Sequence, residues 1–363
     1  MFQNVYRNRR VLITGHTGFK GSWLAHWLLR LGAEVTGVSI DVPTEPSHFA
    51  RTGLAGLMDD RRMDIRDRTG ITDLIRELQP DFVFHLAAQP LVWHSYTHPA
   101  ETFEVNVQGT VNILEGLRLL DRPCTAVLIT SDKCYENREW VWGYKETDRL
   151  GGKDPYSASK GAAELAIKGY HASFFSQNSP VRIATGRAGN VIGGGDWAPN
   201  RIVPDCIRAW VGKEAVEIRN PRATRPWQHV LEPLSGYLAL GMRLLKDRNL
   251  AGEAFNFGPP PNQNHTVETL IRAMSDHWAG ASFLLTAKEN SPHEAGLLKL
   301  DCDKANWLLS WKPVLSFADT VRLTAEWYRE EGGGKENMLP VTLAQIEIYE
   351  RLALEGDLEW TRE

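Results

Sequence analysis

Short apolar runs alternate with segments of helical periodicity along the first half of the chain. The apolar runs fall at residues 10–14, 34–40, 81–86, 125–130 and 181–187, and they have the length and composition of buried strands. The segments at 20–31, 69–78, 99–120 and 156–175 repeat their apolar positions with the spacing of a helix. Strands that alternate with helices predict an α/β fold with a doubly wound parallel sheet.

This alternation stops near residue 187. Residues 189–200 are rich in Gly, Asn, Asp and Trp, which indicates loops. Helical segments return at 202–211, 234–245, 267–277 and 317–330, with short apolar pieces such as 254–257 between them. We therefore predict a sheet domain at 1–187, to which a segment near 226–258 returns, and a smaller, mixed α/β C-terminal lobe, mainly at 188–330. Residues 331–363 are predicted to form a glycine-rich linker, 332–334, and a last helix at 341–354.

Composition and charge narrow the class of protein. A net charge of -4 and a pI near 6.3 give no global attraction to nucleic acid or to an anionic membrane. The N-terminus has no signal-type segment, and no apolar run is long enough to span a bilayer. The four cysteines are scattered without a CxxC pair or a Cys/His cluster, which argues against a metal site and fits free thiols in a reducing cytoplasm.

A glycine-rich loop follows the first predicted strand and opens the first helix. It reads Gly15-His16-Thr17-Gly18-Phe19-Lys20-Gly21, and such a loop lets the backbone approach a pyrophosphate at the N-terminus of the helix. We predict that Gly15, Thr17, Gly18, Phe19 and Gly21 bind a dinucleotide, which makes residues 1–187 a Rossmann-type domain. The loop alone is weak evidence, but here a strand precedes it and a helix follows.

Other residues of the same half extend the predicted cofactor site. Asp41 ends the second strand 20 residues beyond Gly21, where a carboxylate binds ribose hydroxyls and repels a 2′-phosphate, so NAD is favoured over NADP. Asp64 and Ile65 are candidate adenine contacts, although Asp64 is equally explained as a turn or cap residue. The small residues of Leu86-Ala87-Ala88 let backbone lie against a cofactor, and ordinary strand–helix packing explains them almost as well.

The candidate catalytic residues lie in two short segments of the sequence. Tyr156 and Lys160 lie four residues apart, which stacks them on one face of a helix, and an ammonium beside a phenol favours the phenolate. Ser131, Asp132 and Lys133 follow an apolar strand and supply a hydroxyl, a carboxylate and an amine. One tyrosine base is enough to oxidise an alcohol, so the additional acid and base predict further chemistry. The competing interpretation of Asp132 and Lys133 is a solvated ion pair at a strand end.

Together these motifs resemble the extended short-chain dehydrogenase/reductase family. The resemblance rests on the GxxGxxG loop, the Leu-Ala-Ala turn, Asn106 and the YxxxK pair, and it covers most of the chain. Within the family, sugar-nucleotide 4,6-dehydratases typically carry Thr-Asp-Glu after the fifth strand, where this chain has Ser131-Asp132-Lys133. Residues 135–144, 151–156 and 224–230 resemble dehydratases that act on CDP-glucose, which implies a role in deoxysugar and surface polysaccharide synthesis.

The resemblance implies an NAD-dependent dehydration. Tyr156 takes the proton of the sugar 4-hydroxyl while hydride leaves C4, with Ser131 bonded to the same oxygen and Lys160 holding the tyrosinate and the ribose. Asp132 then protonates the departing 6-hydroxyl. Lys133 is either the base that removes the C5 proton or a cation that stabilises the enolate, because a free lysine is almost wholly protonated at neutral pH.

The residues predicted to bind the substrate lie near the end of the fourth strand and in the irregular second half of the chain. We assign to it Gln89, Asn190, Arg201, Arg225 and His229. The resemblance places Asn190 and Arg225 on the diphosphate, for which the planar fork of arginine is suited. A surface ion pair explains Arg201 equally well, and His229 is better explained as a loop-fixing hydrogen bonder. His293-Glu294 stands where related dehydratases often have an arginine.

Two other functions share part of this pattern. A sugar-nucleotide 4-epimerase has the tyrosine, the lysine and the glycine loop but needs no elimination acid or base. A dinucleotide-sensing protein without turnover has no need of the Tyr–Lys pair. The helices at 99–120 and 156–175 lie where family members form a four-helix interface, which predicts a homodimer or a dimer of dimers.

Overall fold

The structure is a computed structural model that describes residues 1–176, 178–218, 220–260, 263–286 and 297–362. His293 and Glu294 therefore lie outside the described residues. In the described part of the chain, no helix is both long enough and apolar enough to cross a membrane.

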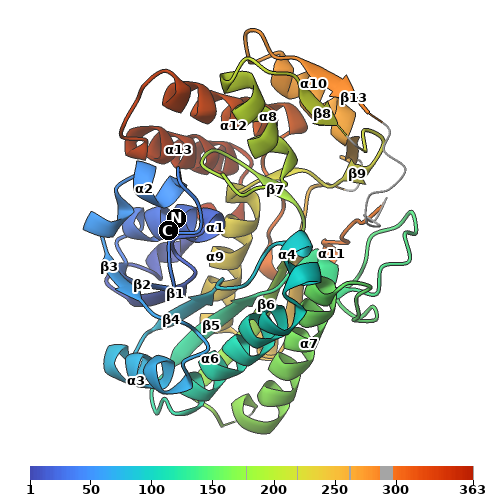
Figure 1. The fold of residues 1–363 in the computed structure, drawn as a ribbon. Helices are drawn as coiled ribbons and strands as arrows, with labels where there is room; N and C mark the ends of the chain where they lie inside the picture. Colours follow the sequence, from blue (N-terminus) through green and yellow to red (C-terminus); the bar gives the residue numbers. More distant parts are fainter. Residues whose placement is uncertain (177, 219, 261–262, 287–296, 363) are drawn as a thin grey trace.

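A seven-stranded, wholly parallel sheet forms the centre of the molecule (Figure 1). Its order is β11-β6-β5-β4-β1-β2-β3, so the chain starts in the middle, winds out to one edge and returns to complete the other. The strands are β1 (Arg10–Thr14), β2 (Glu34–Ser39), β3 (Asp59–Arg62), β4 (Phe82–His85), β5 (Cys124–Ile129), β6 (Val181–Ala188) and β11 (Ala254–Phe257). This confirms the predicted Rossmann-type doubly wound fold.

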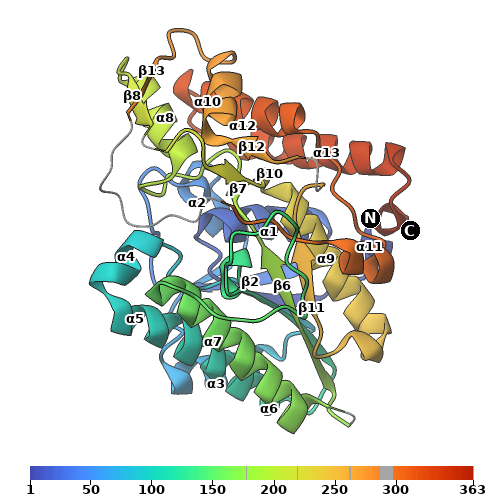
Figure 2. The same cartoon turned by 90° about the vertical axis from the view of Figure 1, so that its right-hand side faces the viewer.

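Alternate residues of the strands pack into two separate hydrophobic cores. Val11 and Ile13 of β1 join the core under α1 and α9, whereas Leu12 between them joins the core under α3, α6 and α7. Figure 2 shows these two helix layers on opposite faces of the sheet. The layers consist of α1 (Phe19–Arg30) and α9 (Leu231–Lys246) on one face, and α3 (Arg68–Leu78), α6 (Gly109–Arg118) and α7 (Pro155–Tyr170) on the other.

The helix predicted at 99–120 contains a wider turn that the sequence did not indicate. It consists of α5 (Pro99–Phe103), a π-helical turn at Glu104–Gln108 and then α6. The helix predicted at 156–175 likewise ends in a π-helical turn, His171–Phe175. The first of these turns carries Asn106, whose side chain joins two other elements at the site, which is where such turns are often found.

A second group of elements lies over the carboxyl ends of the strands (Figure 1). Three two-stranded ladders, β10–β7, β12–β9 and β13–β8, connect its helices. This group contains α2 (His48–Arg51), α4 (Val92–Thr97), β7 (Val191–Ile192), α8 (Ile202–Val211), β8 (Val216–Ile218), β9 (Thr224–Arg225), β10 (Gln228–His229), β12 (His265–Thr266), α10 (Val267–Ser275), β13 (Phe283–Leu285) and α12 (Phe317–Gly332). Two further helices pack elsewhere: α11 (Asp303–Leu309) on β11 and α9, and α13 (Leu339–Glu355) on α1. The domain boundaries at 187 and 330 stay predictions.

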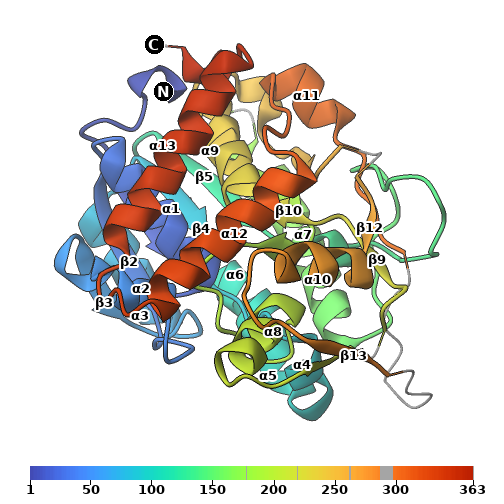
Figure 3. The ribbon, with the colours of Figure 1, turned by 90° about the horizontal axis from the view of Figure 1, so that it is seen from above.

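The last helix, α13, packs along α1 instead of hanging from a flexible joint (Figure 3). Glu350 accepts a hydrogen bond from Trp27 Nε1 at 2.9 Å and pairs with Arg30 at 3.1 Å. The rings of Phe2 and Trp360 stack 4.7 Å apart, which places the two ends of the chain together. Residues of the C-terminus therefore brace the helix that carries the glycine loop.

A buried ion pair fixes α7 against β6. Arg187 donates from Nε and Nη2 to the two carboxylate oxygens of Glu164, each at 2.8 Å, and from Nη1 to the hydroxyl of Tyr135. Both charged side chains are 4% exposed, so loss of either would leave the other charge buried without a counterion.

We expect Arg187→Met to lower the free energy of unfolding by about 3–5 kcal/mol, because the Glu164 carboxylate loses its buried partner. Urea denaturation measures this loss. The matched control, Arg272→Met, removes the exposed pair between Glu268 and Arg272 and is expected to cost no more than about 1 kcal/mol. Equal losses in the two variants would contradict the role assigned to burial.

Candidate active site

One cavity of about 860 Å³ extends over the carboxyl ends of the central strands and under the second group of elements. It brings together residues that lie far apart in the sequence, as expected for a doubly wound sheet. Its lining includes every predicted site residue except His229, namely Gly15, Thr17, Gly18, Phe19, Gly21, Asp41, Asp64, Ile65, Leu86, Ala87, Ala88, Gln89, Ser131, Asp132, Lys133, Tyr156, Lys160, Asn190, Arg201 and Arg225.

The glycine loop forms a tight cradle whose shape fits a dinucleotide diphosphate. Gly15 has φ of +81°, and a Cβ there would lie 2.7 Å from the backbone nitrogen of Ala87. A Cβ on Gly21 would lie 2.0 Å from the carbonyl oxygen of Gly15. Gly18 caps α1 without a side chain, so the first N–H groups of the helix face the cavity with no side-chain acceptor.

We expect Gly21→Ala to abolish binding of a dinucleotide at micromolar concentration and to lower the melting temperature, because the new methyl group would overlap the Gly15 carbonyl. Nucleotide titration and thermal unfolding measure the two effects. Gly56→Ala is the control, since a Cβ on Gly56 meets nothing within 4 Å. Unchanged nucleotide binding by Gly21→Ala would contradict the assignment of this loop.

The end of the cavity near β2 and β3 suits the adenosine half of a dinucleotide. Thr17 Oγ1 donates to the carbonyl oxygen of Asp41 at 2.6 Å, which fixes the loop beside the end of β2. Asp64 both lines the cavity and serves as the turn residue of the alternative interpretation, because it accepts from the backbone N–H of Arg66 at 2.8 Å. Its bonds to Arg66 lower the pKa of Asp64.

Asn106 holds the wall that follows β4. Its Oδ1 accepts from the N–H of Gln89 at 2.8 Å, and its Nδ2 donates to Ser159 Oγ at 2.9 Å. The π-helical turn therefore ties the Ala87–Gln89 segment to α7, one residue away from Lys160. These two hydrogen bonds give Asn106 a structural function, which is to hold the segment after β4 against α7.

Tyr156 and Lys160 lie on the buried face of α7, as their spacing predicted. Asp154 caps the helix by accepting from the N–H of Ser157 at 2.9 Å. Burial raises the pKa of Tyr156 to about 12, and the weaker effect of a hydrogen bond with Ser131 lowers it. Burial also lowers the pKa of Lys160 to about 8. Loss of hydration therefore dominates the pKa of Tyr156 in this state, and the phenol needs a nearby positive charge to act as a base.

The three residues after β5 form one hydrogen-bonded group. Ser131 Oγ donates to Asp132 Oδ1 at 3.0 Å, and Lys133 Nζ lies 3.5 Å from the same oxygen. Asp132 is 1% exposed, and its Oδ2 has no hydrogen-bond partner in the described part of the chain. A buried carboxylate oxygen without a partner, which faces a cavity, points to a ligand that would satisfy it.

Of the residues predicted to bind substrate, all but His229 line the cavity. Arg201 pairs with Asp196 at 2.8 Å, as the ion-pair interpretation expects, and its contact with substrate stays a prediction for a residue that lines the cavity. The buried Oδ1 of Asn190 has no partner among the described residues, and Arg225 lies on β9. His229 is fully buried against Trp23, outside the cavity lining, and burial lowers its pKa to about 3. Its Nδ1 accepts a hydrogen bond from the N–H of Leu231 at 3.4 Å, so the hydrogen-bonding role of its alternative interpretation fits this structure.

Sequence reasoning missed several residues of the cavity. No function was predicted for Lys20, although it lies within the glycine loop, and a lysine in a loop of this kind indicates a binding residue. Trp93 and Tyr96 of α4 also line the cavity, and the segment that became α4 was too short to be recognised by periodicity.

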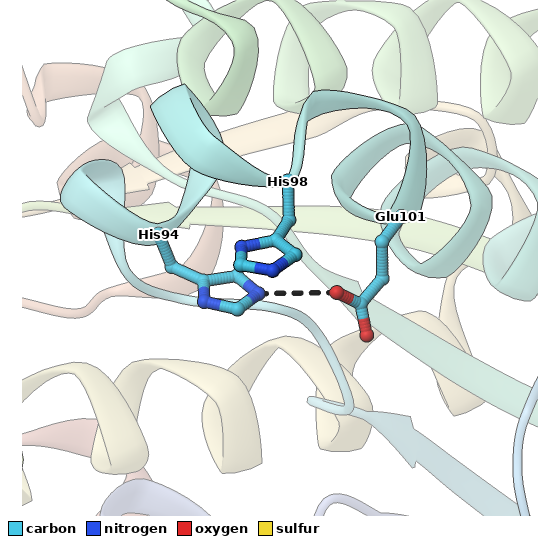
Figure 4. A group of neighbouring side chains, drawn as sticks. All are labelled: His94, His98 and Glu101. Carbon is cyan, nitrogen blue, oxygen red and sulfur yellow. Dashed lines mark hydrogen bonds and ion pairs between the residues drawn. The ribbon is translucent and has the colours of Figure 1, made fainter.

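A group of potential metal ligands on α4 and α5 was also missed (Figure 4). The ligand atoms of His94, His98 and Glu101 lie within 4.8 Å of one another, and His94 bonds Glu101 at 3.1 Å. The two imidazole rings stack 4.3 Å apart at an angle of 8°. Lone pairs in two parallel ring planes do not converge on one ion at the ~2.0 Å that an imidazole ligand requires. We therefore assign no metal to this group.

The comparisons with known proteins agree with this geometry. A model of the GDP-mannose 4,6 dehydratase family matches residues 12–324. The chain is 46% identical over 351 residues to the CDP-glucose 4,6-dehydratase of Salmonella typhimurium, covering 96% of this chain and 98% of that one. It is 27% identical to the CDP-paratose 2-epimerase of Salmonella typhi, over 88% of this chain and 98% of that one.

Among solved structures, the dTDP-glucose 4,6-dehydratase DesIV of Streptomyces venezuelae, with NAD bound, has a similar fold. Its TM-score is 0.76 at 24% identity, over 90% of this chain and 98% of that one. The parallel sheet, the glycine loop and the Tyr156–Lys160 pair define an α/β protein of the extended short-chain dehydrogenase/reductase type. Within that class, the chain belongs to the GDP-mannose 4,6 dehydratase family.

Proposed function

We propose that the protein dehydrates CDP-glucose to CDP-4-keto-6-deoxyglucose with NAD as a bound cofactor. The observation that carries this proposal is one cavity that joins a diphosphate cradle, a Tyr–Lys pair and the Ser131-Asp132-Lys133 group. The glycine loop fits NAD, and the similarity to a CDP-glucose 4,6-dehydratase supports the substrate. When bound, NAD would accept hydride from C4 of the sugar and return it to C6.

The first task of the protein groups is removal of the proton from the 4-hydroxyl. Tyr156 is the proposed acceptor, and Ser131 is the group that shares a hydrogen bond with it. The raised pKa of Tyr156 means that this phenol is a base only when positive charge is close. Lys160, one helical turn away, supplies such a charge below its pKa of about 8.

The second task is elimination of water across C5 and C6. Lys133 and Asp132 share Oδ1 at 3.5 Å, so transfer of one proton between them yields a neutral amine and a neutral carboxylic acid at no change in net charge. The amine takes the C5 proton, and the acid gives its proton to the departing 6-hydroxyl, which leaves as water. The same ammonium later gives a proton back to C5, which leaves the pair one proton short. The proton that Tyr156 took from the 4-hydroxyl replaces it through Ser131, which bonds both Tyr156 and Asp132, so all three groups end as they began.

The diphosphate of the substrate is assigned to Asn190, Arg201 and Arg225. All three residues line the cavity, and the two guanidinium groups and the amide Nδ2 of Asn190 can donate hydrogen bonds to phosphate oxygens. Gln89 lies near the sugar end, held by Asn106. Trp197 and Trp227 also line the cavity and offer ring faces to a base.

Mass spectrometry tests the substrate. Purified protein is incubated with NAD and, separately, with CDP-, dTDP-, UDP- and GDP-activated hexoses. The proposal expects loss of one water from CDP-glucose at a rate at least tenfold above the others. Loss of water only from a different nucleotide sugar would retain the reaction and refute the nucleotide.

A 4-epimerase remains the rival function because such enzymes share the fold and the Tyr–Lys pair. Epimerisation needs no acid at position 132, and it does not change the mass of the substrate. The buried, unpartnered carboxylate oxygen of Asp132 favours dehydration.

We further propose a homodimer formed through α6 and α7. Their outer faces and the adjoining turns expose Phe103, Leu119, Leu165 and Phe174. Light scattering at micromolar concentration is expected to give at least twice the mass of the chain. The free cysteines support a reducing cytoplasm as the compartment.

A further inference from the structure

Lys20 is a cation in the glycine loop that has no acidic partner of its own. It is the second residue of α1, and its side chain lines the cavity. In the described part of the chain it makes neither an ion pair nor a side-chain hydrogen bond. Its Nζ lies 6.0 Å from the centre of the Tyr237 ring, on the wall formed by α9. A lysine at the start of a helix also opposes the positive end of the helix dipole, so its presence there needs a reason.

The charged groups around Lys20 place it at the reactive end of the cavity. Asp132 and Lys133 face it from the turn after β5, Lys160 from α7 and Arg201 from the start of α8. Tyr237 faces it from α9, and the hydroxyl of this tyrosine is buried without a partner among the described residues.

This environment contains more positive than negative charge. Three other cations, Lys133, Lys160 and Arg201, lie near Lys20, against two carboxylates, Asp132 and the Asp196 that pairs with Arg201. Burial and the charge of Arg201 lower the pKa of Lys20 to about 7, whereas Asp132 acts the other way. Lys20 is therefore protonated below neutrality and loses its charge as the pH rises through about 7.

We infer that Lys20 tunes the cofactor, because its ammonium group lies beside the nicotinamide end of bound NAD and disfavours the cationic, oxidised ring relative to the neutral, reduced ring. This inference rests on the proposed use of NAD. Two like unit charges in a partly buried site repel each other, and this repulsion vanishes when the ring takes up hydride.

Two consequences for the reaction follow. The charge favours the first hydride transfer, in which the sugar C4 is oxidised and the ring becomes neutral. It also holds the reduced cofactor more tightly while the sugar loses water, so the hydride stays in the site until it returns to C6. Lys20 is thus a tuning residue, while the proton transfers stay with Tyr156, Asp132 and Lys133.

The test compares the affinities of the protein for NADH and NAD, measured separately by titration of tryptophan fluorescence at pH 6.5. We expect Lys20→Met to reduce the ratio of NADH affinity to NAD affinity by about tenfold or more, because the Coulomb repulsion between the ammonium and the cationic ring is lost. Lys20→Arg keeps the charge and is expected to retain a ratio within about threefold of the unchanged protein. Lys168→Met removes an exposed lysine of α7 and is the control for a general change of charge.

The pH dependence provides a second readout that a purely structural role would not produce. In the unchanged protein the ratio is expected to fall as the pH rises from 6 to 8, since Lys20 loses its proton in this window. Lys20→Arg should remove this fall, because arginine stays charged. Lys160 also titrates, with a pKa of about 8, but it does so in all the variants, so the difference between them isolates Lys20.

The outcomes separate the inference from the proposed function. If the unchanged protein binds neither NAD nor NADH, the proposed function fails. If it binds both, and Lys20→Met leaves their ratio and its pH dependence unchanged, the inference about Lys20 is wrong while the proposed function stands. Should Lys20→Met not fold, the pH series of the unchanged protein against Lys20→Arg decides alone, and identical slopes would overturn the inference.

Discussion

Replacing Tyr156 with phenylalanine is expected to lower kcat for nucleotide-sugar turnover by roughly 10²–10⁴-fold, the usual range for a general base. The substitution removes one oxygen from a side chain that is 7% exposed and leaves the ring in place. Ser131 keeps its hydrogen bond to Asp132, and the 4-hydroxyl of the sugar loses its proton acceptor. Binding of NAD and substrate should change by less than about threefold, because the chemistry of this hydroxyl is needed only in the transition state.

Single-turnover absorbance of NADH measures the step directly. In Tyr156→Phe the reduction of NAD should slow by the same factor as the overall reaction, since removal of the 4-hydroxyl proton accompanies the first hydride transfer. Tyr170→Phe is the control on the same helix, because its hydroxyl bonds Glu115 on the outer face. A Tyr156→Phe variant with near-normal reduction of NAD would show that another group is the base.

The second large effect is expected for Lys133→Met, at a different step. Product formation should fall by roughly 10²–10⁴-fold, while reduction of NAD by substrate in a single turnover should stay within about fivefold of normal. The reason is that Lys133 handles the C5 proton, which becomes acidic only after C4 is a ketone. The variant thus stops the reaction between two chemical steps.

Deuterium exchange identifies this block. In heavy water, the unchanged protein should incorporate one solvent deuterium at C5 of the product, and Lys133→Met should incorporate essentially none into substrate or product. Lys168→Met, an exposed residue of α7, should exchange normally. Normal exchange at C5 in Lys133→Met would remove Lys133 from the proton transfer and leave Asp132 as the catalytic half of the pair.

The order of strands and helices in the first half could be predicted because local patterns determine it. The apolar runs at 125–130 and 181–187 became β5 and β6 with little change, since a strand buried on both faces needs an uninterrupted apolar run. β3 at the sheet edge reads Asp59-Asp60-Arg61-Arg62, so its strand character arises from pairing with β2 and not from its own sequence. The π-helical turn at Asn106 left no periodicity signal either.

The candidate site could be predicted where a short motif carries its own geometry. Gly15 to Gly21 and Tyr156 to Lys160 are such motifs, and the structure places both on the cavity. Contacts between distant segments were not predictable, such as α13 on α1 through Glu350 and Trp27. The pKa of Tyr156 also depends on burial by residues from several elements, which no local motif records.

The proposed mechanism requires that the hydride that leaves C4 return to C6 of the same sugar while water is lost. The direct measurement uses CDP-glucose that carries deuterium at C4, with the product analysed by mass spectrometry and by NMR. The account predicts a product lighter by one water that keeps the deuterium, now on C6. A product of unchanged mass, or one that has lost both the water and the deuterium, would contradict it.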